Sequence, residues 1–449
     1  MMKKTIWLVW GLLSLALASY YGYQLLMPGD KSEFLIGDAS HGHFQIELDC
    51  ESCHTSPFGG QEVLQDACVN CHGAELEAVN DSHPKNKFTD PRNADRVEIL
   101  DARYCVTCHV EHQEERTHEM GVTVPEDFCF RCHQDIGSDR PSHEGLTFDT
   151  CASAGCHNYH DNLALYEAFL VKHAEGAETD LMATMLERTF ATEYQEKHKP
   201  ESLTIADLNP ADLKQASADV LQHWQDSGHA EAGVTCSGCH QGEQNSESWI
   251  AQPGLAQCSE CHTSEVQDFV ASRHGMRLNP DMAMKMSPMS PGMGRLEFKP
   301  DALSSVQGCA ACHQPHQYQT QPAMAEACVG CHDDEHTNNF AQSPHGQLWQ
   351  KVKEGALPEE RGVACSTCHM PREHVQINGK DVVRVQHNPN HNLRPNEKMI
   401  RSSCMNCHSL AFSIDALADP DLIRSNFSGK PAKHIESIDM ALSRVKEKN

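Results

Sequence analysis

The sequence is poor in aromatic and apolar residues for its length. Of its 449 residues, 39% are hydrophobic and only 6% are Phe, Trp or Tyr. That is little material from which two or three domains of this total size could build ordinary hydrophobic cores. Basic residues are also few, since 36 Lys and Arg against 63 Asp and Glu leave a formal charge of −27. This acidity argues against nucleic acid as a partner, because a phosphate backbone attracts Lys and Arg.

The chain also lacks any cysteine outside one repeated pattern. All 22 cysteines stand in pairs that are followed directly by His, ten as C-x-x-C-H and one as C-x4-C-H. No cysteine remains for a disulfide. In chain order the groups are Cys50, Cys53 and His54; Cys68, Cys71 and His72; Cys105, Cys108 and His109; Cys129, Cys132 and His133; Cys151, Cys156 and His157; Cys236, Cys239 and His240; Cys258, Cys261 and His262; Cys309, Cys312 and His313; Cys328, Cys331 and His332; Cys365, Cys368 and His369; and Cys404, Cys407 and His408.

This spacing has a chemical reason. Two thiols three positions apart can form thioethers to the two vinyl groups of one haem, and the next residue, His, then reaches the iron. Zinc sites would use the cysteine pairs but need no His after each one, and a thiol redox motif would occur once rather than eleven times. The pattern therefore predicts eleven covalently attached c-type haems, whose macrocycles would supply the apolar surface that the composition lacks.

Of the 30 histidines, 19 remain once each motif has used one. Many of them lie close to a motif, so we expect most haems to have two histidine ligands and a lower potential than Met/His haems. There are more spare histidines than sites, so the individual assignments stay open. The expected second ligands are His41, His43, His83, His112, His143, His160, His229, His274, His316, His345 and His374.

Three of these histidines share a local frame, an aromatic residue followed by S-x-H-[AG]. The frame contains His229, His274 and His345. Its recurrence predicts second ligands held at the ends of helices. Residues 276–293, which follow the second copy of the frame, hold six methionines. One methionine could ligate an iron, but Met more often fills gaps beside flat apolar surfaces.

The expected fold is mainly α with much irregular structure, in which two haem blocks are joined by a helical segment. We divide the chain into an N-terminal segment 1–30, a five-haem block 31–160, a helical connector 161–225, a six-haem block 226–415 and a helical tail 416–449. Apolar spacing predicts connector helices around 166–173 and 182–190 and a third from the cap Asn209 to Gly228. Residues 435–445 have helical spacing in the tail.

The N-terminus predicts export. Lys3 and Lys4 precede an uncharged stretch, Thr5–Met27, about long enough to cross a bilayer. The competing interpretation is a cleaved signal peptide, because Ala16-Leu17-Ala18 forms an A-x-A site after a short apolar core. Apolar residues continue beyond that site, which favours a retained inner-membrane anchor. Either interpretation places the haem blocks in the periplasm.

Residues 224–415 carry a longer ordered pattern. It includes the Cys309 motif with Pro315-His316, the Cys328 motif with Glu335-His336, Ser343-Pro-His345-Gly346, His369-Met370-Pro371-Arg372 and the closing Cys404 motif with Ser409. In this order and spacing the block resembles the hydroxylamine oxidoreductase family of multihaem cytochromes. The first block, with His41-Gly42-His43 before a motif and the C-x4-C-H variant, resembles small low-potential multihaem cytochromes c.

The resemblance of the second block implies one haem that binds a nitrogen compound in place of a second ligand. By position this would be the haem on Cys309 and Cys312, with His336 and Glu335 as catalytic residues above it. The sequence departs from the family here, because Glu335 stands where the family has Asp. No Tyr follows Tyr318 to form the family's cross-link, and no motif has the Lys that the related nitrite reductases use.

Two functions follow. The first is a relay that passes electrons along mostly bis-His haems between a membrane donor and a periplasmic acceptor, with redox proteins as partners. The alternative is a reductase of nitrite, hydroxylamine or a sulfur oxyanion at the haem on Cys309 and Cys312, with a small inorganic substrate. Haem storage or sensing is a third and weaker interpretation. The negative net charge would attract basic cytochromes to the protein. The strength of this attraction would depend strongly on the salt concentration.

Overall fold

The structure is a computed structural model that describes residues 2–27, 31–56, 59–140, 143–144, 159–161, 165–242, 245–317, 320–391 and 397–448. The C-x4-C-H motif, with Cys151, Cys156 and His157, lies outside these residues. The described chain is mainly helical with much irregular structure, as predicted. Most helices are short, and several of them consist of a single cysteine motif.

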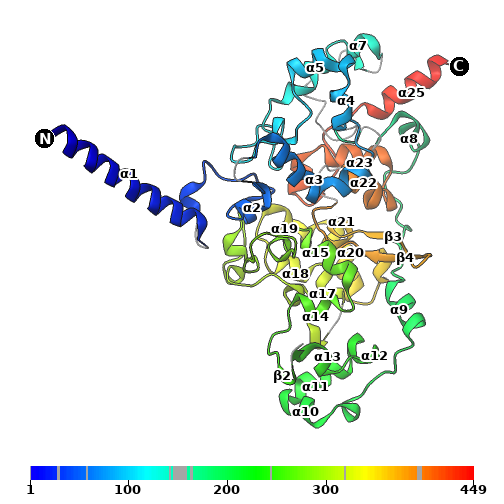
Figure 1. Ribbon diagram of the computed structural model, residues 1–449. Helices are drawn as coiled ribbons and strands as arrows, with labels where there is room; N and C mark the ends of the chain where they lie inside the picture. Colours follow the sequence, from blue (N-terminus) through cyan, green and yellow to red (C-terminus); the bar gives the residue numbers. More distant parts are fainter. Residues whose placement is uncertain are drawn as a thin grey trace.

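The helix α1 (Met2–Leu26) projects away from the rest of the molecule, which is elongated (Figure 1). In the first block and the connector, the helices are α2 (Cys50–Cys53), α3 (Gln61–Ala78), α4 (Lys85–Thr89), α5 (Ala94–Ile99), α6 (Phe130–His133), α7 (Ile136–Asp139), α8 (Glu167–Lys172), α9 (Phe190–His198), α10 (Pro210–Gln215) and α11 (Ala218–Gln225).

The second block and the tail continue with further short helices. They are α12 (Gly228–Glu231), α13 (Cys236–His240), α14 (Leu255–Ser259), α15 (Thr263–Val270), α16 (Cys309–Cys312), α17 (Thr320–Met324), α18 (Glu326–Val329), α19 (Glu335–Asn339), α20 (Pro344–Lys353), α21 (Cys365–His369), α22 (Glu397–Ser402), α23 (Leu410–Leu417), α24 (Pro420–Arg424) and α25 (Ser437–Lys448).

Two antiparallel hairpins are the sheets of the described chain. The strand β1 (Gln241–Gly242) pairs with β2 (Asn245–Trp249), and β3 (Arg372–Ile377) pairs with β4 (Lys380–Val385). Asn378 and Gly379 close the second hairpin, both with positive φ, which suits an Asn-Gly turn. The sequence analysis did not predict these strands.

The connector differs in part from its predicted helices. Asn209 caps α10 and Pro210 occupies its first position, as expected. The predicted helix to Gly228 is divided, because Ser217 caps a second helix, α11. Residues 182–189 are irregular, since the backbone N–H groups of Met185 and Thr189 donate to Glu360 and Val383 rather than within a helix.

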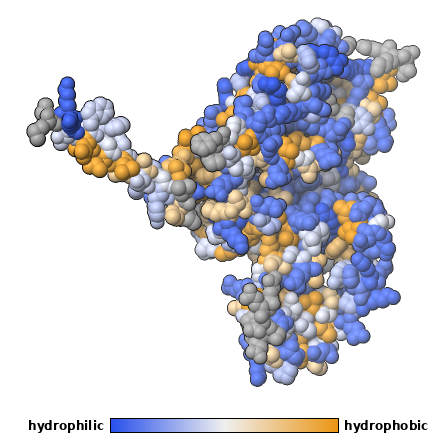
Figure 2. All heavy atoms as spheres, viewed as in Figure 1, coloured by the Kyte–Doolittle hydropathy of each residue, from blue (hydrophilic) through white to orange (hydrophobic). Residues whose placement is uncertain are grey.

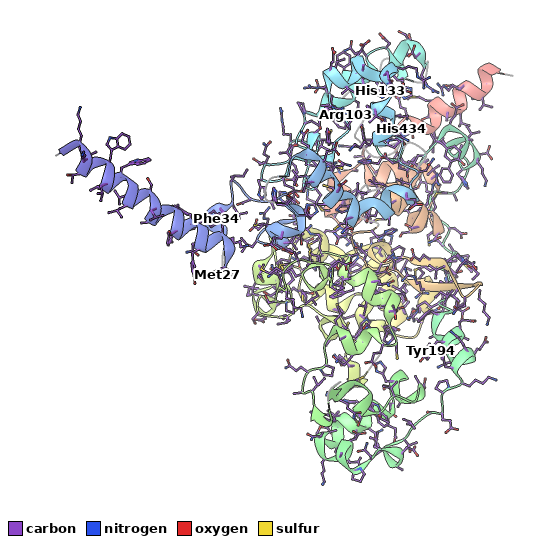
Figure 3. The ribbon with its side chains drawn as sticks, viewed as in Figure 1. Met27, Phe34, Arg103, His133, Tyr194 and His434 are labelled. Carbon is purple, nitrogen blue, oxygen red and sulfur yellow. The ribbon has the colours of Figure 1, made fainter. Side chains whose placement is uncertain are left out.

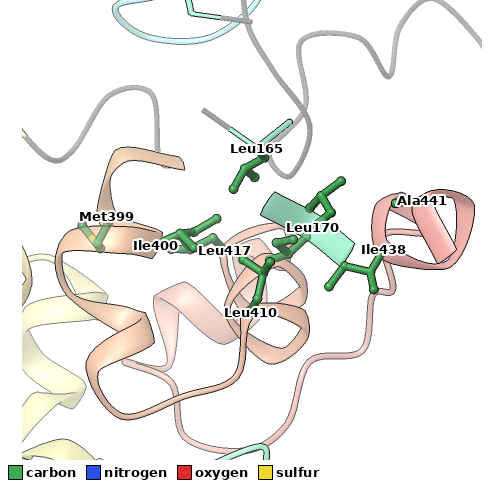
Figure 4. Close-up of a cluster of buried hydrophobic side chains, with 9 residues drawn as sticks. Leu165, Leu170, Met399, Ile400, Leu410, Leu417, Ile438 and Ala441 are labelled. Atoms are coloured by element: carbon green, nitrogen blue, oxygen red, sulfur yellow. The ribbon is translucent and has the colours of Figure 1, made fainter. Parts of the chain in front are cut away.

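The hydrophobic cores among the described residues are small. The largest joins α8, α22, α23 and α25, and so ties the connector and the tail to the last motif (Figure 4). Its buried members are Leu165, Leu170, Met399, Ile400, Leu410, Ile414, Leu417, Ile438 and Ala441. Figure 2 shows apolar side chains along α1 and in separate patches over the body. Such small cores agree with the low apolar content of the chain.

The docking of α25 should depend on pH through His434. Its Nδ1 lies 3.0 Å from Asp415 of α23 and its Nε2 lies 2.8 Å from Asp439 of α25 (Figure 3). These hydrogen bonds raise the pKa of His434 to about 9. The two hydrogen bonds of protonated His434 therefore stabilise the docking of α25 fully below the ordinary pKa of His, about 6.5. This stabilisation is lost as pH rises through about 9.

Hydrogen exchange of the α25 amides measures this effect. We expect faster exchange at about pH 10 than at about pH 7 after correction for intrinsic rates, by a small factor because the site is exposed. The His434→Ala variant should lose the difference. Equal protection in the native protein at both pH values would contradict the proposed bridge.

Candidate haem-binding sites

In nine of the eleven motifs, the histidine ring faces the ring of a spare histidine. The rings are held in pairs with their centres 5.8–6.5 Å apart. The pairs are His72–His43 (5.8 Å), His109–His160 (6.5 Å), His133–His83 (6.2 Å), His240–His316 (5.8 Å), His262–His229 (6.3 Å), His313–His387 (6.3 Å), His332–His274 (6.3 Å), His369–His336 (6.4 Å) and His408–His345 (6.1 Å).

This separation fits a metal ion between the two rings. Imidazoles bound on opposite sides of one metal, each with a metal–nitrogen distance of about 2.0–2.1 Å, have ring centres about 6.3 Å apart. Each pair combines one motif histidine with one spare histidine. The residues present therefore fit a haem iron with two axial histidines, attached through the two cysteines of the motif.

The two remaining motif histidines, His54 and His157, differ from this pattern. His54 follows α2, where its backbone N–H donates to the Cys50 carbonyl at 2.7 Å. In the part of the chain that the structure describes, its ring faces no spare histidine, so the expected bis-His arrangement is not seen at this motif. His157 lies outside the described residues together with Cys151 and Cys156, so the ligation predicted for that motif stays a prediction.

The cysteines lie near the surface of the described chain. Cys71, Cys261 and Cys312 are exposed, and the other described cysteines are partly buried. Cys368 and Cys404 pack against the largest core, and Cys365 and Cys236 pack against the two smaller ones. The other described cysteines belong to none of these cores, and such partly open thiols suit attachment to a large group that covers them. Cys261 of the Cys258 motif lies beside Tyr194 of α9, which brings the connector to that site.

Hydrogen bonds fix the orientation of several spare rings. Nδ1 donates to a backbone carbonyl in four of them: His83 to Tyr159 (2.5 Å), His229 to Pro315 (3.0 Å), His336 to Ile423 (2.6 Å) and His387 to Val385 (3.0 Å). A proton on Nδ1 leaves the lone pair of Nε2 for a metal. Such outer hydrogen bonds are typical of metal-binding histidines.

In two other spare histidines, a carboxylate and not a backbone carbonyl is the hydrogen-bond partner of Nδ1. Nδ1 of His43 lies 2.6 Å from Glu111, and Nδ1 of His160 lies 3.2 Å from Asp81. Although burial opposes ionisation of Glu111, its hydrogen bonds to His43 and Ser40 lower its pKa to about 2. A carboxylate in this place makes the imidazole a stronger electron donor to a bound metal.

The repeated S-x-H-[AG] frame adopts one local structure. Ser227, Ser272 and Ser343 are fully buried, and the Oγ of each donates to the carbonyl three residues earlier at 2.7 Å. Ser227 caps α12 and Ser343 caps α20, while Ser272 follows the end of α15. The frame thus places its three histidines at helix ends, where the sequence predicted them.

Other predicted ligands have different surroundings. His374 lies on the hairpin strand β3, where its Nδ1 is 2.8 Å from Asp381 and its side chain is 54% exposed. His41 lies between Glu115, at 2.8 Å, and Glu119, at 3.8 Å. Neither ring faces a motif histidine of the described chain. His112 donates through Nδ1 to the Gly37 carbonyl at 2.9 Å, like the four anchored histidines above.

The structure adds two candidate ligands, His387 and His336, that were not among the expected second ligands. His387 faces His313, so the Cys309 motif has a second histidine. His387 follows strand β4 and belongs to no repeated frame, so no local signal pointed to it. The structure places His336 opposite His369 and not over the Cys309 motif, and the Glu335 side chain is 76% exposed beside Arg424. The two predicted catalytic residues are therefore not brought together over that site.

The motifs lie side by side in space in nearly the order of the sequence. Cys68 lies beside Cys105, Cys258 beside Cys309, and Cys328 beside Cys365. Elements that carry neighbouring motifs also pack on each other, α2 on α3, α13 on α14, and α16 on α18. The influence of charge on the thiols of Cys53, Cys108 and Cys368 shows that Cys71, Cys132 and Cys407 are their respective neighbours. The first four motifs form one series, and the last six form another.

The competing uses of the cysteines do not fit this geometry. Within the described ranges, no group of three or more His, Cys, Asp or Glu side chains is arranged to hold a bare metal ion.

Comparison with known proteins agrees with this assignment for the first block. Residues 42–134 match the cytochrome c3 family, over a region with the first four motifs. No curated protein matches the chain. The chain is thus a multihaem c-type cytochrome that carries covalent haem, transfers electrons and has redox proteins as partners. The match does not reach the second block, whose resemblance to the hydroxylamine oxidoreductase family stays a prediction.

Proposed function

We propose that the protein is an exported, membrane-anchored electron relay with eleven c-type haems, one on each cysteine pair. The observation that carries the proposal is the set of nine histidine pairs with a separation that suits one iron each. Bound there, the haem supplies a one-electron Fe(III)/Fe(II) couple. The chain's own residues hold each group in place and lower its potential through histidine ligation.

For the two remaining motifs we propose ligands from the first block. His112 is the candidate opposite His54, because its Nδ1 hydrogen bond to Gly37 leaves Nε2 for a metal. Its positive φ of 61° is a strained conformation for His, which is frequent at functional sites. His143 is the candidate opposite His157, the histidine of the C-x4-C-H motif. The remaining predicted ligands, His41 and His374, are not proposed, because carboxylates flank both ring nitrogens of His41 and the His374 side chain is 54% exposed.

The contacts between motifs support a relay rather than a reductase. A relay needs its redox groups close together, and the helices α13 and α14, and α16 and α18, which carry neighbouring motifs, pack on each other. A reductase needs one iron with an open position. At the Cys309 site, His387 occupies the place where a substrate would bind. His336, the proposed catalytic residue of the reductase, lies instead opposite His369 of the Cys365 site. The Cys309 site, where the reductase alternative needs its open position, therefore has a histidine in that place.

Membrane attachment is proposed from the first helix. Lys3–Leu25 is long and apolar enough to cross a bilayer, and none of this span is buried against the body, although a signal sequence would also meet this description. The following segment is tied to the first motif, because Tyr21 contacts Phe34 and Lys31 lies 4.0 Å from Glu51 (Figure 3). A retained anchor would therefore hold the Cys50 site close to the periplasmic face of the membrane and to a membrane donor.

Electron paramagnetic resonance of the oxidised protein tests the proposal. The angle between two axial imidazole planes sets the splitting of the iron d orbitals, so parallel and perpendicular pairs give different low-spin signals. Near-parallel pairs are His109–His160 (18°) and His240–His316 (15°). Near-perpendicular pairs are His83–His133 (85°), His229–His262 (76°), His274–His332 (87°), His336–His369 (77°) and His345–His408 (70°).

We expect both classes of low-spin signal, with the perpendicular class the larger, and a protein mass that accounts for eleven haems. The samples should be recorded with and without nitrite or hydroxylamine. A high-spin signal that changes on adding either compound would contradict the pure relay and support the reductase.

A further inference from the structure

The order of the sequence suggests a linear path, in which electrons leave the first block and enter the second at its first motif, Cys236. We infer a different path, which rests on the relay function proposed above. The first block delivers electrons to the middle of the second block, at the site formed by Cys328, Cys331, His332 and His274, here called the junction site. The second block then has two separate arms.

The contact between the blocks is a turn of the first block held by arginines of the second. The turn η2 (Phe44–Ile46) packs on η9 (Met276–Leu278). Phe44 is buried, and the guanidinium carbons of Arg273 and Arg295 lie 5.5 and 4.7 Å from the centre of its ring. Such cation–π contacts strengthen as water is excluded.

Backbone groups of the same turn are also bound. Arg277 donates to the Gln45 carbonyl at 2.5 Å, and Arg295 donates to the Ala39 carbonyl at 3.1 Å. The acidic first block and the arginines of residues 273–295 thus form a fixed joint and not a loose contact. Its geometry should persist in solution.

The residues of this joint adjoin two proposed haem ligands. Phe44 directly follows His43, which faces His72 of the Cys68 site. Arg273 directly precedes His274, which faces His332 of the junction site. The contact between Arg273 and Phe44 therefore links the second ligands of two sites that belong to different blocks.

The following segment reinforces the joint on the same side. Ser52 and Asp49, at the first motif, accept hydrogen bonds from the backbone N–H groups of Ala283 (3.1 Å) and Met284 (3.3 Å). The Sδ of Met282 lies 3.4 Å from the Ser52 Oγ. The methionine-rich segment thus packs against the first motif, and it comes directly after the loop that carries His274.

The junction site has a neighbour on each side within the second block. The helix α16, with Cys309 and Cys312 of the preceding motif, packs on α18, which carries Cys328. On the other side, Cys365 of the next motif and Val329 pack against the same small core. One arm therefore runs back through the Cys309, Cys258 and Cys236 sites. The other arm runs on through the Cys365 and Cys404 sites.

Figure 1 shows the consequence for the shape of the path. The helices α11, α12 and α13, around the Cys236 motif, lie at the end of the molecule opposite to α4 and α5 of the first block. One electron that leaves the reduced Cys68 site reduces the junction site, with no bond made or broken. From there it can move to either arm, so the protein can serve two acceptors from one donor.

A light-triggered electron from a single label tests this path. Every native cysteine belongs to a haem motif, so Ile36→Cys would be the one free thiol, and Ile36 is 90% exposed in the segment that leads to the first motif. A ruthenium photosensitiser on that thiol, with a sacrificial donor, injects one electron beside the first block. The label is placed in the full anchored chain.

Two matched variants act as electron traps in the second block. His274→Met and His229→Met change the same position of the S-x-H-[AG] frame, and a Met ligand raises the potential of its site. In the His274→Met variant the trap is the junction site. In the His229→Met variant the trap is the Cys258 site, which an electron reaches from the junction site in two further transfers, through the Cys309 site. Loss of the near-infrared charge-transfer band of a ferric Met/His haem reports the arrival of the electron.

We expect the His274→Met trap to fill at least roughly tenfold faster than the His229→Met trap. A faster His229→Met trap would overturn the inference and support the linear path. If either variant fails to retain its haems, Arg273→Ala should slow reduction of the second block roughly tenfold, with Arg92→Ala, at an 88% exposed side chain of the first block, as control. Equal rates of reduction of the second block in the two arginine variants would overturn the inferred path. The low-spin spectrum of the native protein tests ligation separately from the path.

Discussion

The His387→Ala variant is expected to convert one low-spin haem to a high-spin, ligand-binding haem. Its ring is the one that faces His313, at 6.3 Å. The imidazole is oriented by the Nδ1 hydrogen bond to the Val385 carbonyl, 3.0 Å long. Alanine removes the sixth ligand and leaves a position above the Cys309 site. The ferric spectrum should gain one high-spin signal, and the reduced protein should bind one carbon monoxide per chain.

The matched control is His374→Ala on the neighbouring hairpin. His374 was the histidine of this region that the sequence favoured, but it is half exposed and bound to Asp381. Its removal should leave every haem low-spin. The assignment would be contradicted if the His387 variant stayed low-spin throughout, or if the His374 variant gained the high-spin signal. Binding of carbon monoxide by the native protein would restore the reductase alternative.

A second large effect is expected from Gly346→Ala. Gly346 is buried in the first turn of α20, where its N–H donates to the Ser343 Oγ at 3.1 Å. A Cβ there would overlap the backbone carbonyl of Phe340. A backbone group cannot rotate away as a side chain can, so the turn itself must move. Forced overpacking of this kind typically costs about 1–3 kcal/mol.

The displaced turn carries His345, which faces His408 at 6.1 Å. We therefore expect a lower melting temperature together with a new high-spin signal from the Cys404 site. Gly308→Ala is the control, because a Cβ there meets nothing within 4 Å. An unchanged spectrum and melting temperature for Gly346→Ala would contradict this account. The first copy of the frame has Ala230 at the position of Gly346, so the frame itself tolerates a Cβ. The clash at Gly346 comes from the close approach of the Phe340 carbonyl.

The fold class followed from the sequence, but the elements did so only in part. The cap at Asn209 and the tail helix α25 were predicted from local patterns and are present. The helix expected at 182–190 is absent over 182–189, since strands and loops far away in the sequence bind its backbone. The long helix α3 contains the second motif, where no helix was predicted.

The sequence by itself predicts eleven attachment motifs, because a c-type site uses contiguous residues whose spacing alone matches the haem vinyl groups and the iron. It also placed His229, His274 and His345 at helix ends, because a repeated local frame encodes one turn. Only the tertiary structure decided which spare histidine faces which motif, since these partners come from distant segments. It brought His387 to the Cys309 motif and left His374 on the surface. It also joined the two blocks through Phe44 and Arg273, a contact that no local pattern encodes.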